Sequence, residues 1–142
     1  RFGDPEAMNV LSVLETDFMD ICNAIVAGSL ADLKIVFANK ATVCKYVVPA
    51  GYPDNPSKGF EVVCNPKLDG LYLAAVQEKN GVITATGSRT AAFVGVDPDI
   101  TIAEHLAEKG VNAIGGNLFH RKDIGTTGLI DRRKKHMKKV LG

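Results

Sequence analysis

Two short segments near the ends of the chain carry residue types that bind anions. The first is Arg1-Phe2-Gly3-Asp4-Pro5-Glu6, where a cation and a glycine precede the start signal of a helix. Free N–H groups at a helix start attract negative charge, and an arginine can hold a carboxylate or phosphate with two hydrogen bonds. The residues alone leave two interpretations open, an ordinary capped helix start or a site for an anion.

The second segment is His120-Arg121-Lys122-Asp123-Ile124-Gly125, at a junction between predicted elements. A phosphate clamp here would use Arg121 as a forked donor or Lys122 as a point charge, with Asp123 orienting one of them. A solvated charge cluster is the more usual account of such a run. Sequence spacing does not choose between the two.

No complete catalytic constellation accompanies these segments. The sequence has no glycine-rich phosphate loop of the Walker or dinucleotide type, no metal-ligand spacing, and no Ser or Cys with an obvious partner His. We expect solvated or helix-surface positions for the three histidines, His105, His120 and His136. The cysteines are odd in number and widely spaced in apolar runs, which predicts buried, reduced thiols at Cys22, Cys44 and Cys64.

The composition is that of a globular protein. Hydrophobic residues make up 46% of the 142, and the net charge is only +1, so disorder is not expected. No apolar run approaches the roughly 18 residues that cross a bilayer, and the N-terminus does not resemble a signal peptide. We therefore expect a cytoplasmic protein with no membrane contact. Because the chain does not begin with Met, we also expect it to be cut from something longer.

Helical and β-rich periods alternate along the chain. Asp4 and Pro5 predict a helix start, Thr16-Asp17 is a second start signal, and Gly28 is a stop. From Ala41 the period is that of strands separated by turn signals, and Asn80-Gly81 predicts a type I′ hairpin. The expected β runs are Thr42–Val48, Phe60–Cys64, Leu71–Val76, Val82–Thr86 and Thr90–Val96.

Two further helices are expected after the β unit. Thr101 and Glu104 form a capping box ahead of an amphipathic stretch that stops before Gly115-Gly116. The spacing of Leu129, Ile130, Arg133, Met137, Val140 and Leu141 predicts a terminal amphipathic helix. The stretch from His120 to Lys139 holds eight Lys and Arg against two Asp, so the basic charge is local to this end. These elements predict an α+β fold.

Both charged segments resemble signatures of the phosphoribosylamine–glycine ligase (glycinamide ribonucleotide synthetase) family, "RFGDPE" and "RKDIG". Shorter matches lie between them at Thr16-Asp17-Phe18, Ala50-Gly51-Tyr52-Pro53, Lys58-Gly59 and Ser88-Arg89. Ala50 replaces the first glycine of the family's "GGYP", and Ser88 stands where many bacterial members have Gly. The run Leu71–Val76 lacks the His-Ala-Gly of those members, so the pattern is closer to archaeal ones.

The resemblance implies a domain organisation and a reaction. Residues 1–40 would be the helical tail of an ATP-grasp domain, and residues 41–142 a β-rich domain of the rudimentary single hybrid motif type with flanking helices. The family joins 5-phosphoribosylamine to glycine, using ATP with Mg²⁺ or Mn²⁺. Its nucleotide loops and metal ligands lie upstream of "RFGDPE". We therefore expect this chain to bind no ATP or metal by itself, to be inactive alone, and to need the remainder of the ligase chain.

The resemblance also assigns expected substrate contacts. Arg1, Gly3, Asp4 and Pro5 match the family loop that faces the active site, and are expected to contact glycine or 5-phosphoribosylamine. Arg121-Lys122 matches the basic pair of "RKDIG", and both residues are expected to bind the substrate phosphate.

Other classes of function fit parts of the sequence less well. Nucleic-acid binding by the basic run Asp131–Lys139 would draw on counterion release, but the run has no interleaved aromatic residues and its apolar residues follow helical spacing. A biotin or lipoyl carrier would place a lysine at the tip of a tight hairpin. Lys138 lies in a predicted helix, and Lys79, beside Asn80-Gly81, lacks the flanking Met or Asp. The chain could also exist as a separate subunit or a proteolytic product.

Overall fold

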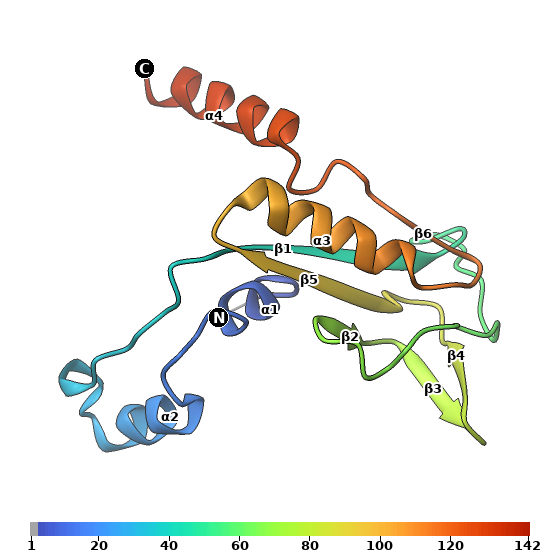
Figure 1. Ribbon diagram of the computed structural model, residues 1–142, viewed down its shortest axis with the longest axis horizontal. Helices are drawn as coiled ribbons and strands as arrows, with labels where there is room; N and C mark the ends of the chain where they lie inside the picture. Colours follow the sequence, from blue (N-terminus) through green and yellow to red (C-terminus); the bar gives the residue numbers. More distant parts are fainter. Residues whose placement is uncertain (1–2) are drawn as a thin grey trace.

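The computed structural model describes residues 3–142 and is built around one antiparallel sheet (Figure 1). Four strands pair in the order β2-β5-β1-β6, with bounds β1 Ala41–Pro49, β2 Leu71–Leu73, β5 Ala91–Asp97 and β6 Leu118–His120. A separate hairpin joins β3 (Val76–Lys79) to β4 (Val82–Ala85). The helices are α1 Glu6–Leu11, α2 Phe18–Ala27, α3 Ile100–Asn112 and α4 Thr127–Leu141, with a short 3-10 turn at Leu30–Asp32. The predicted α+β class is confirmed.

Strand β1 alternates between two environments, because successive side chains of a strand point to opposite faces. Val43, Lys45 and Val47 face α3 and the residues that follow it. Cys44 and Tyr46 face the N-terminal segment that contains α1. One strand therefore contacts chain segments from both ends of the sequence.

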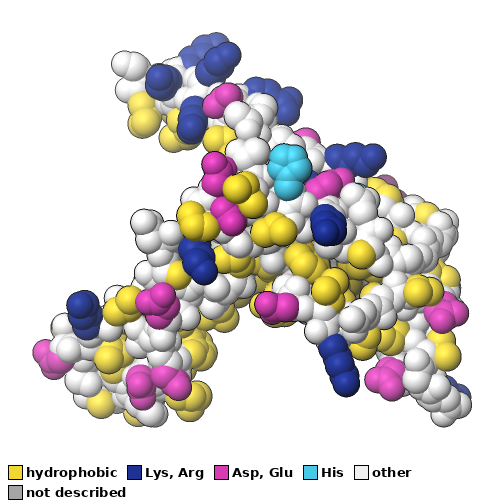
Figure 2. Space-filling view, viewed as in Figure 1, with side chains coloured by type: hydrophobic (Ala, Val, Ile, Leu, Met, Phe, Trp, Pro, Cys, Tyr) yellow, Lys and Arg dark blue, Asp and Glu magenta, His cyan; other side chains and the backbone are white. Residues whose placement is uncertain are grey.

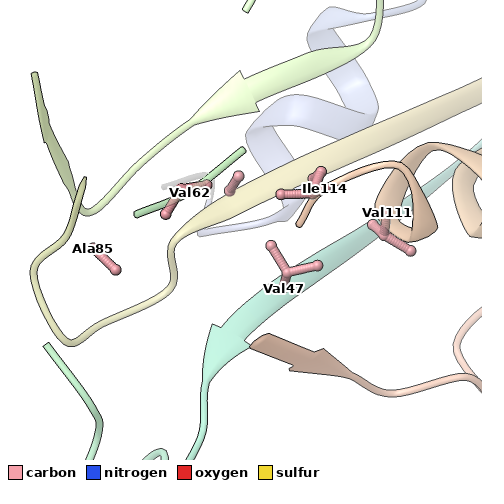
Figure 3. Close-up of a cluster of buried hydrophobic side chains, with 6 residues drawn as sticks. Val47, Val62, Ala85, Val111 and Ile114 are labelled. Atoms are coloured by element: carbon pink, nitrogen blue, oxygen red, sulfur yellow. The ribbon is translucent and has the colours of Figure 1, made fainter. Parts of the chain in front are cut away.

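The main hydrophobic core joins the sheet, the hairpin and the end of α3. Figure 3 shows its buried side chains converging from these separate elements; the members are Val47, Val62, Ala85, Ala91, Val111 and Ile114. Helix α3 lies very close to β5, since a Cβ atom at Gly95 would overlap the backbone of Ala103, and one at Gly110 would overlap the ring of Phe93. Both glycines are needed for this close approach.

Most predicted β runs are confirmed, and the hairpin prediction holds in detail. Asn80 and Gly81 both have positive φ, 52° and 79°, as a type I′ turn requires. The run Leu71–Val76 is divided between β2 and β3. The expected strand at Phe60–Cys64 is wrong as a continuous strand. It makes only isolated bridges, Glu61 to β4 and Val63 to the loop after α3, because its two sides pair with different elements.

Helices α1, α2 and α3 begin close to their predicted starts, but only the cap and the stop predicted for α2 are confirmed. Asp17 accepts a hydrogen bond from the backbone N–H of Met19 to start α2, and Gly28 ends it in a left-handed conformation. Asp4 does not cap α1, which begins without a side-chain cap. Asp99 caps α3 in place of the predicted capping box, because Glu104 turns inward to a buried cation.

Helices α2 and α4 lie away from the sheet (Figure 1). No residue of either helix is buried. Figure 2 shows Lys and Arg gathered over α4, with hydrophobic side chains also exposed there and over α2. The exposed apolar residues include Phe18, Met19, Ile25 and Val26 on α2, and Met137, Val140 and Leu141 on α4. Within residues 3–142, no helix combines the length and the apolar character needed to cross a membrane.

Candidate functional site

A pocket of about 310 Å³ brings the two charged segments together beside β1. Pro5 from the first segment and Arg121 from the second both line it, and Tyr46 of β1 contributes to the same wall. The rest of the lining is largely apolar and aromatic: Cys44, Val48, Tyr52, Phe119, His120 and Ile124. An apolar cavity with a few polar groups is the usual form of a small-molecule site.

The first segment is held to the sheet by Asp4. Its Oδ1 atom accepts a hydrogen bond of 2.5 Å from the Tyr46 hydroxyl, and its Oδ2 atom lies 3.2 Å from Nη1 of Arg89. Nη1 of Arg89 also donates to the Asp4 carbonyl at 3.3 Å, and the guanidinium lies 5.5 Å from the centre of the Tyr46 ring. The carboxylate of Asp4 is thus engaged by protein groups.

The other predicted residues of this segment have different positions. Arg1 lies outside the described residues. The Gly3 carbonyl accepts a hydrogen bond of 3.1 Å from the backbone N–H of Ala7, in the first turn of α1. Pro5 immediately precedes α1 and reaches the pocket. Within the described part of the segment, Pro5 is the residue that lines this pocket.

The pocket wall next to Asp4 stays neutral over the physiological pH range. Burial, followed by the hydrogen bond to Asp4, raises the pKa of the Tyr46 hydroxyl. Burial, with the negative charge of Asp4, raises the pKa of the Cys44 thiol to about 12. Because only a thiolate is strongly nucleophilic, Cys44 acts as packing. None of the three cysteines is in a disulfide within the described residues, and the expected burial is confirmed for Cys44 but wrong for Cys22 and Cys64, which are half-buried.

In the second segment, Asp123 orients Arg121. Nε and Nη2 of Arg121 donate to the two carboxylate oxygens of Asp123 at 3.1 and 2.8 Å. The Arg121 hydrogen bonds lower the pKa of Asp123. A guanidinium has five N–H donors, so this pairing leaves others available to a ligand. The Arg121 side chain is 66% exposed, and it also lines a second cavity of about 390 Å³ with basic residues of α4.

The structure places Lys122 differently from Arg121. Lys122 is an exposed residue, and its side chain does not line the pocket shared by Pro5 and Arg121. Its backbone carbonyl points inward and accepts a hydrogen bond of 3.1 Å from Nζ of Lys45. The two adjacent cations therefore differ in what they can contact.

A buried ion network beneath this segment was missed by the sequence predictions. Nζ of Lys45 lies 2.6 Å from Oε1 of Glu104 and 2.6 Å from Oε2 of Glu108. Nε2 of His120 lies 3.0 Å from Oε1 of Glu108, so the expected solvated position of His120 is wrong. The sequence does contain a sign of this network. Lys45 lies inside an apolar strand, and Glu104 and Glu108 lie one helical turn apart on the same helix.

The network keeps Glu108 ionised. Burial raises the pKa of the Glu108 carboxyl, but hydrogen bonds from Lys45, His120 and Asn112 outweigh burial and bring it down to about 2. Glu108 therefore carries a full negative charge at neutral pH. It can hold the Lys45 ammonium and the His120 ring at the same time.

This α+β domain, with a pocket between an N-terminal loop and a basic C-terminal loop, matches a known class of ligase domains. Residues 42–127 match the family described as "Phosphoribosylglycinamide synthetase, C domain". The chain belongs to this family, and the resemblance found in its two charged segments is confirmed.

The full-length relatives are phosphoribosylamine–glycine ligases. Those of Methanosarcina barkeri and Methanocella arvoryzae are 52% and 54% identical, in alignments that cover all of this chain and 33% of each relative. That of Methanocaldococcus jannaschii is 48% identical and covers 99% of this chain. The expected similarity to archaeal members is confirmed, and the chain spans about a third of these relatives' length.

A solved structure supports the same fold. The crystal structure of phosphoribosylamine–glycine ligase from Thermotoga maritima superposes with a TM-score of 0.66 at 25% sequence identity. The match covers 87% of this chain and 31% of that protein.

Proposed function

We propose that this chain supplies the C domain of a ligase that joins 5-phosphoribosylamine to glycine, with ATP converted to ADP and phosphate, in purine biosynthesis. The observation that carries the proposal is the pocket shared by Pro5 and Arg121. It joins the two segments that resemble the family's signatures, although they lie at opposite ends of the chain. Family membership and the ligase relatives support the same conclusion.

Arg121 gives this largely apolar pocket a permanently charged group that can take an anionic end of the substrate. Arg121, held in place by Asp123, offers its remaining N–H donors to a phosphate. Lys122 adds positive charge from the adjacent position, outside the pocket. We assign Gly3, Asp4 and Pro5 to the loop that closes the opposite wall, and Arg1 to a contact with the substrate at the start of that loop. In this arrangement Asp4 acts by fixing the loop to Tyr46, not by touching the substrate.

The partner of this domain is the remainder of the ligase. A folded protein rarely exposes large contiguous apolar patches unless they form an interface. Helix α2 buries none of its residues, and Val26 on it is 89% exposed. We propose that residues 1–40 belong to the ATP-grasp domain and that residues 41–142 form the C domain, consistent with the start of β1 at Ala41.

We assign the nucleotide and the metal ions to the remainder of the ligase chain. Residues 3–142 contain no group of three or more His, Cys, Asp or Glu placed to hold a metal ion. ATP and Mg²⁺ or Mn²⁺ would be held by residues of the other domains. The free cysteines are consistent with a cytoplasmic location.

A chimera tests the proposed function. This chain would replace the aligned third of the Methanosarcina barkeri relative, to which it is 52% identical. We expect the chimera to form glycinamide ribonucleotide in a reaction that requires ATP, glycine and 5-phosphoribosylamine. The matched controls are the relative lacking that third and this chain alone, both expected to be inactive. A folded chimera that binds ATP but forms no product would contradict the proposal, and so would ligase activity from this chain alone.

A further inference from the structure

We propose that Lys45 is a positioning residue that holds the segment from His120 to Lys122 against α3, so that Arg121 faces the pocket. This inference rests on the proposed function, in which Arg121 binds the substrate phosphate. Lys45 itself touches no substrate. It lies on the face of β1 that packs against α3.

The Lys45 ammonium is fully buried and fully hydrogen-bonded. Its side chain has no exposed surface. An ammonium has three N–H donors, and the three acceptors present are Oε1 of Glu104, Oε2 of Glu108 and the carbonyl oxygen of Lys122. A buried charge is costly unless it is paired in this way. Moving the Lys122 carbonyl away would leave one buried donor without its acceptor.

The residues on both sides of Arg121 are tied to the same network. Nε2 of His120 lies 3.0 and 3.1 Å from the two carboxylate oxygens of Glu108. The Lys122 carbonyl accepts the hydrogen bond from Lys45 at 3.1 Å. Arg121 therefore lies between two anchored neighbours, and its side chain extends to the pocket. The network fixes the backbone from which the phosphate donor projects.

Neutralising the charge of Lys45 does not require its contact with the Lys122 carbonyl. Glu104 and Glu108 together already supply two carboxylates to one ammonium. Replacing a buried ion cluster with apolar residues is often neutral or stabilising, so stability alone is a weak reason for the network. The contact with a loop carbonyl gives the lysine a role that an apolar residue could not fill.

The first test measures the position of the loop without using activity. Trypsin cleaves after Arg121 and Lys122, and cleavage requires the segment to leave its place. In the chimera described above, Lys45→Met should speed cleavage at these two bonds by about tenfold under native conditions. Val111→Ala is the matched control, because it removes buried apolar volume from α3 without touching the loop. Equal cleavage rates in the two variants would overturn the inference.

The second test separates binding from turnover. Lys45→Met should raise the KM for 5-phosphoribosylamine by about tenfold, with kcat and the KM values for ATP and glycine changed less than about twofold. Val111→Ala should leave all of these near their original values. An unchanged KM for 5-phosphoribosylamine in Lys45→Met would refute the positioning role.

A failure of the Lys45 proposal can be distinguished from a failure to fold and from a failure of the proposed function. If Lys45→Met fails to fold, Glu108→Gln tests whether the network positions the loop. It keeps the side-chain volume but removes the charge that holds Lys45 and His120, and it should show the same two effects in smaller degree. If the unmodified chimera makes no product, the proposed function fails, whereas the cleavage comparison still decides whether Lys45 anchors the loop.

Discussion

The hydroxyl of Tyr46 donates a 2.5 Å hydrogen bond to Asp4, a residue 42 positions earlier in the sequence. The preceding residue of the same strand, Lys45, points to the opposite face and holds the carbonyl of Lys122. Adjacent residues of β1 thus fix the two segments that meet at the pocket. Strand β1 therefore sets where the two segments lie relative to each other in the candidate site.

Removing the Tyr46 hydroxyl should loosen the N-terminal segment. A hydrogen bond to a charged group contributes about 1.5–3 kcal/mol, and the 47% exposure of the Asp4 side chain favours a smaller value. Tyr46→Phe should lower the free energy of unfolding by about 1 kcal/mol, as measured by urea denaturation. Tyr72→Phe is the matched control, since among residues 3–142 its hydroxyl makes a single contact, an exposed one of 3.5 Å with Ser12. Equal losses in both variants would show that the Asp4 contact adds no stability.

The stability of the chain should depend on pH through Glu108. Its pKa is about 2 in the folded state against an ordinary value of 4.5. A depressed folded pKa gives stability that is fully present above pH 4.5 and is lost as the pH falls toward 2. The Glu108 side chain is 26% exposed, so solvent screening reduces the effect, and Glu108→Gln should be less stable by about 2 kcal/mol at pH 7, with a flatter stability profile below pH 4.5. Denaturation series from pH 7 to pH 2 measure this, in the wild-type chain, Glu108→Gln and the exposed control Glu78→Gln. Parallel curves for all three would contradict the assignment.

A methyl group at Gly95 should separate α3 from the sheet. The added Cβ would overlap the backbone of Ala103, which cannot move aside as a flexible side chain could. Gly95→Ala should destabilise the chain by about 3 kcal/mol or more, in the upper part of the range for overpacked cores. Gly128→Ala in α4 is the control, because its Cβ would meet no atom within 4 Å. That variant should be neutral or slightly more stable, since Ala favours helix over Gly. Thermal unfolding of both variants measures the difference.

The sequence predicted features that depend on neighbouring residues. The cap at Asp17, the stop at Gly28 and the turn at Asn80-Gly81 are fixed by local backbone and side-chain chemistry, and all three are confirmed. The caps predicted at Asp4 and Glu104 failed for a common reason. Each carboxylate found a stronger partner far away in sequence, and no local pattern reveals such a partner.

The candidate site was predictable only in part. The two charged segments could be singled out as candidates for anion binding, and the structure places Pro5 and Arg121 in one pocket. The role of Lys45 could not be anticipated in the same way. A lysine in a strand is usually solvated, and its burial depends on the register that sets it opposite Glu104 and Glu108. The contacts of Lys45 with Glu104, Glu108 and the Lys122 carbonyl become visible only in the tertiary structure.

The side chain of Arg121 should determine the affinity for the phosphate end of the substrate. Losing a hydrogen bond to a charged group costs about 1.5–3 kcal/mol, so Arg121→Ala in the chimera should raise the KM for 5-phosphoribosylamine by about 10- to 100-fold. Lys135→Ala on the exposed face of α4 is the charge-matched control and should leave this KM unchanged. The same KM in both variants would remove Arg121 from the site.

Lys122→Ala separates the two roles of the basic pair. It removes the ammonium group but keeps the backbone carbonyl that Lys45 holds, so the loop should stay in place and tryptic cleavage after Arg121 should not accelerate. Because the Lys122 side chain lies outside the pocket, the KM for 5-phosphoribosylamine should rise less than in Arg121→Ala. A larger rise for Lys122→Ala would mean that the ammonium is the main phosphate ligand, and that the substrate binds on the outer side of the loop.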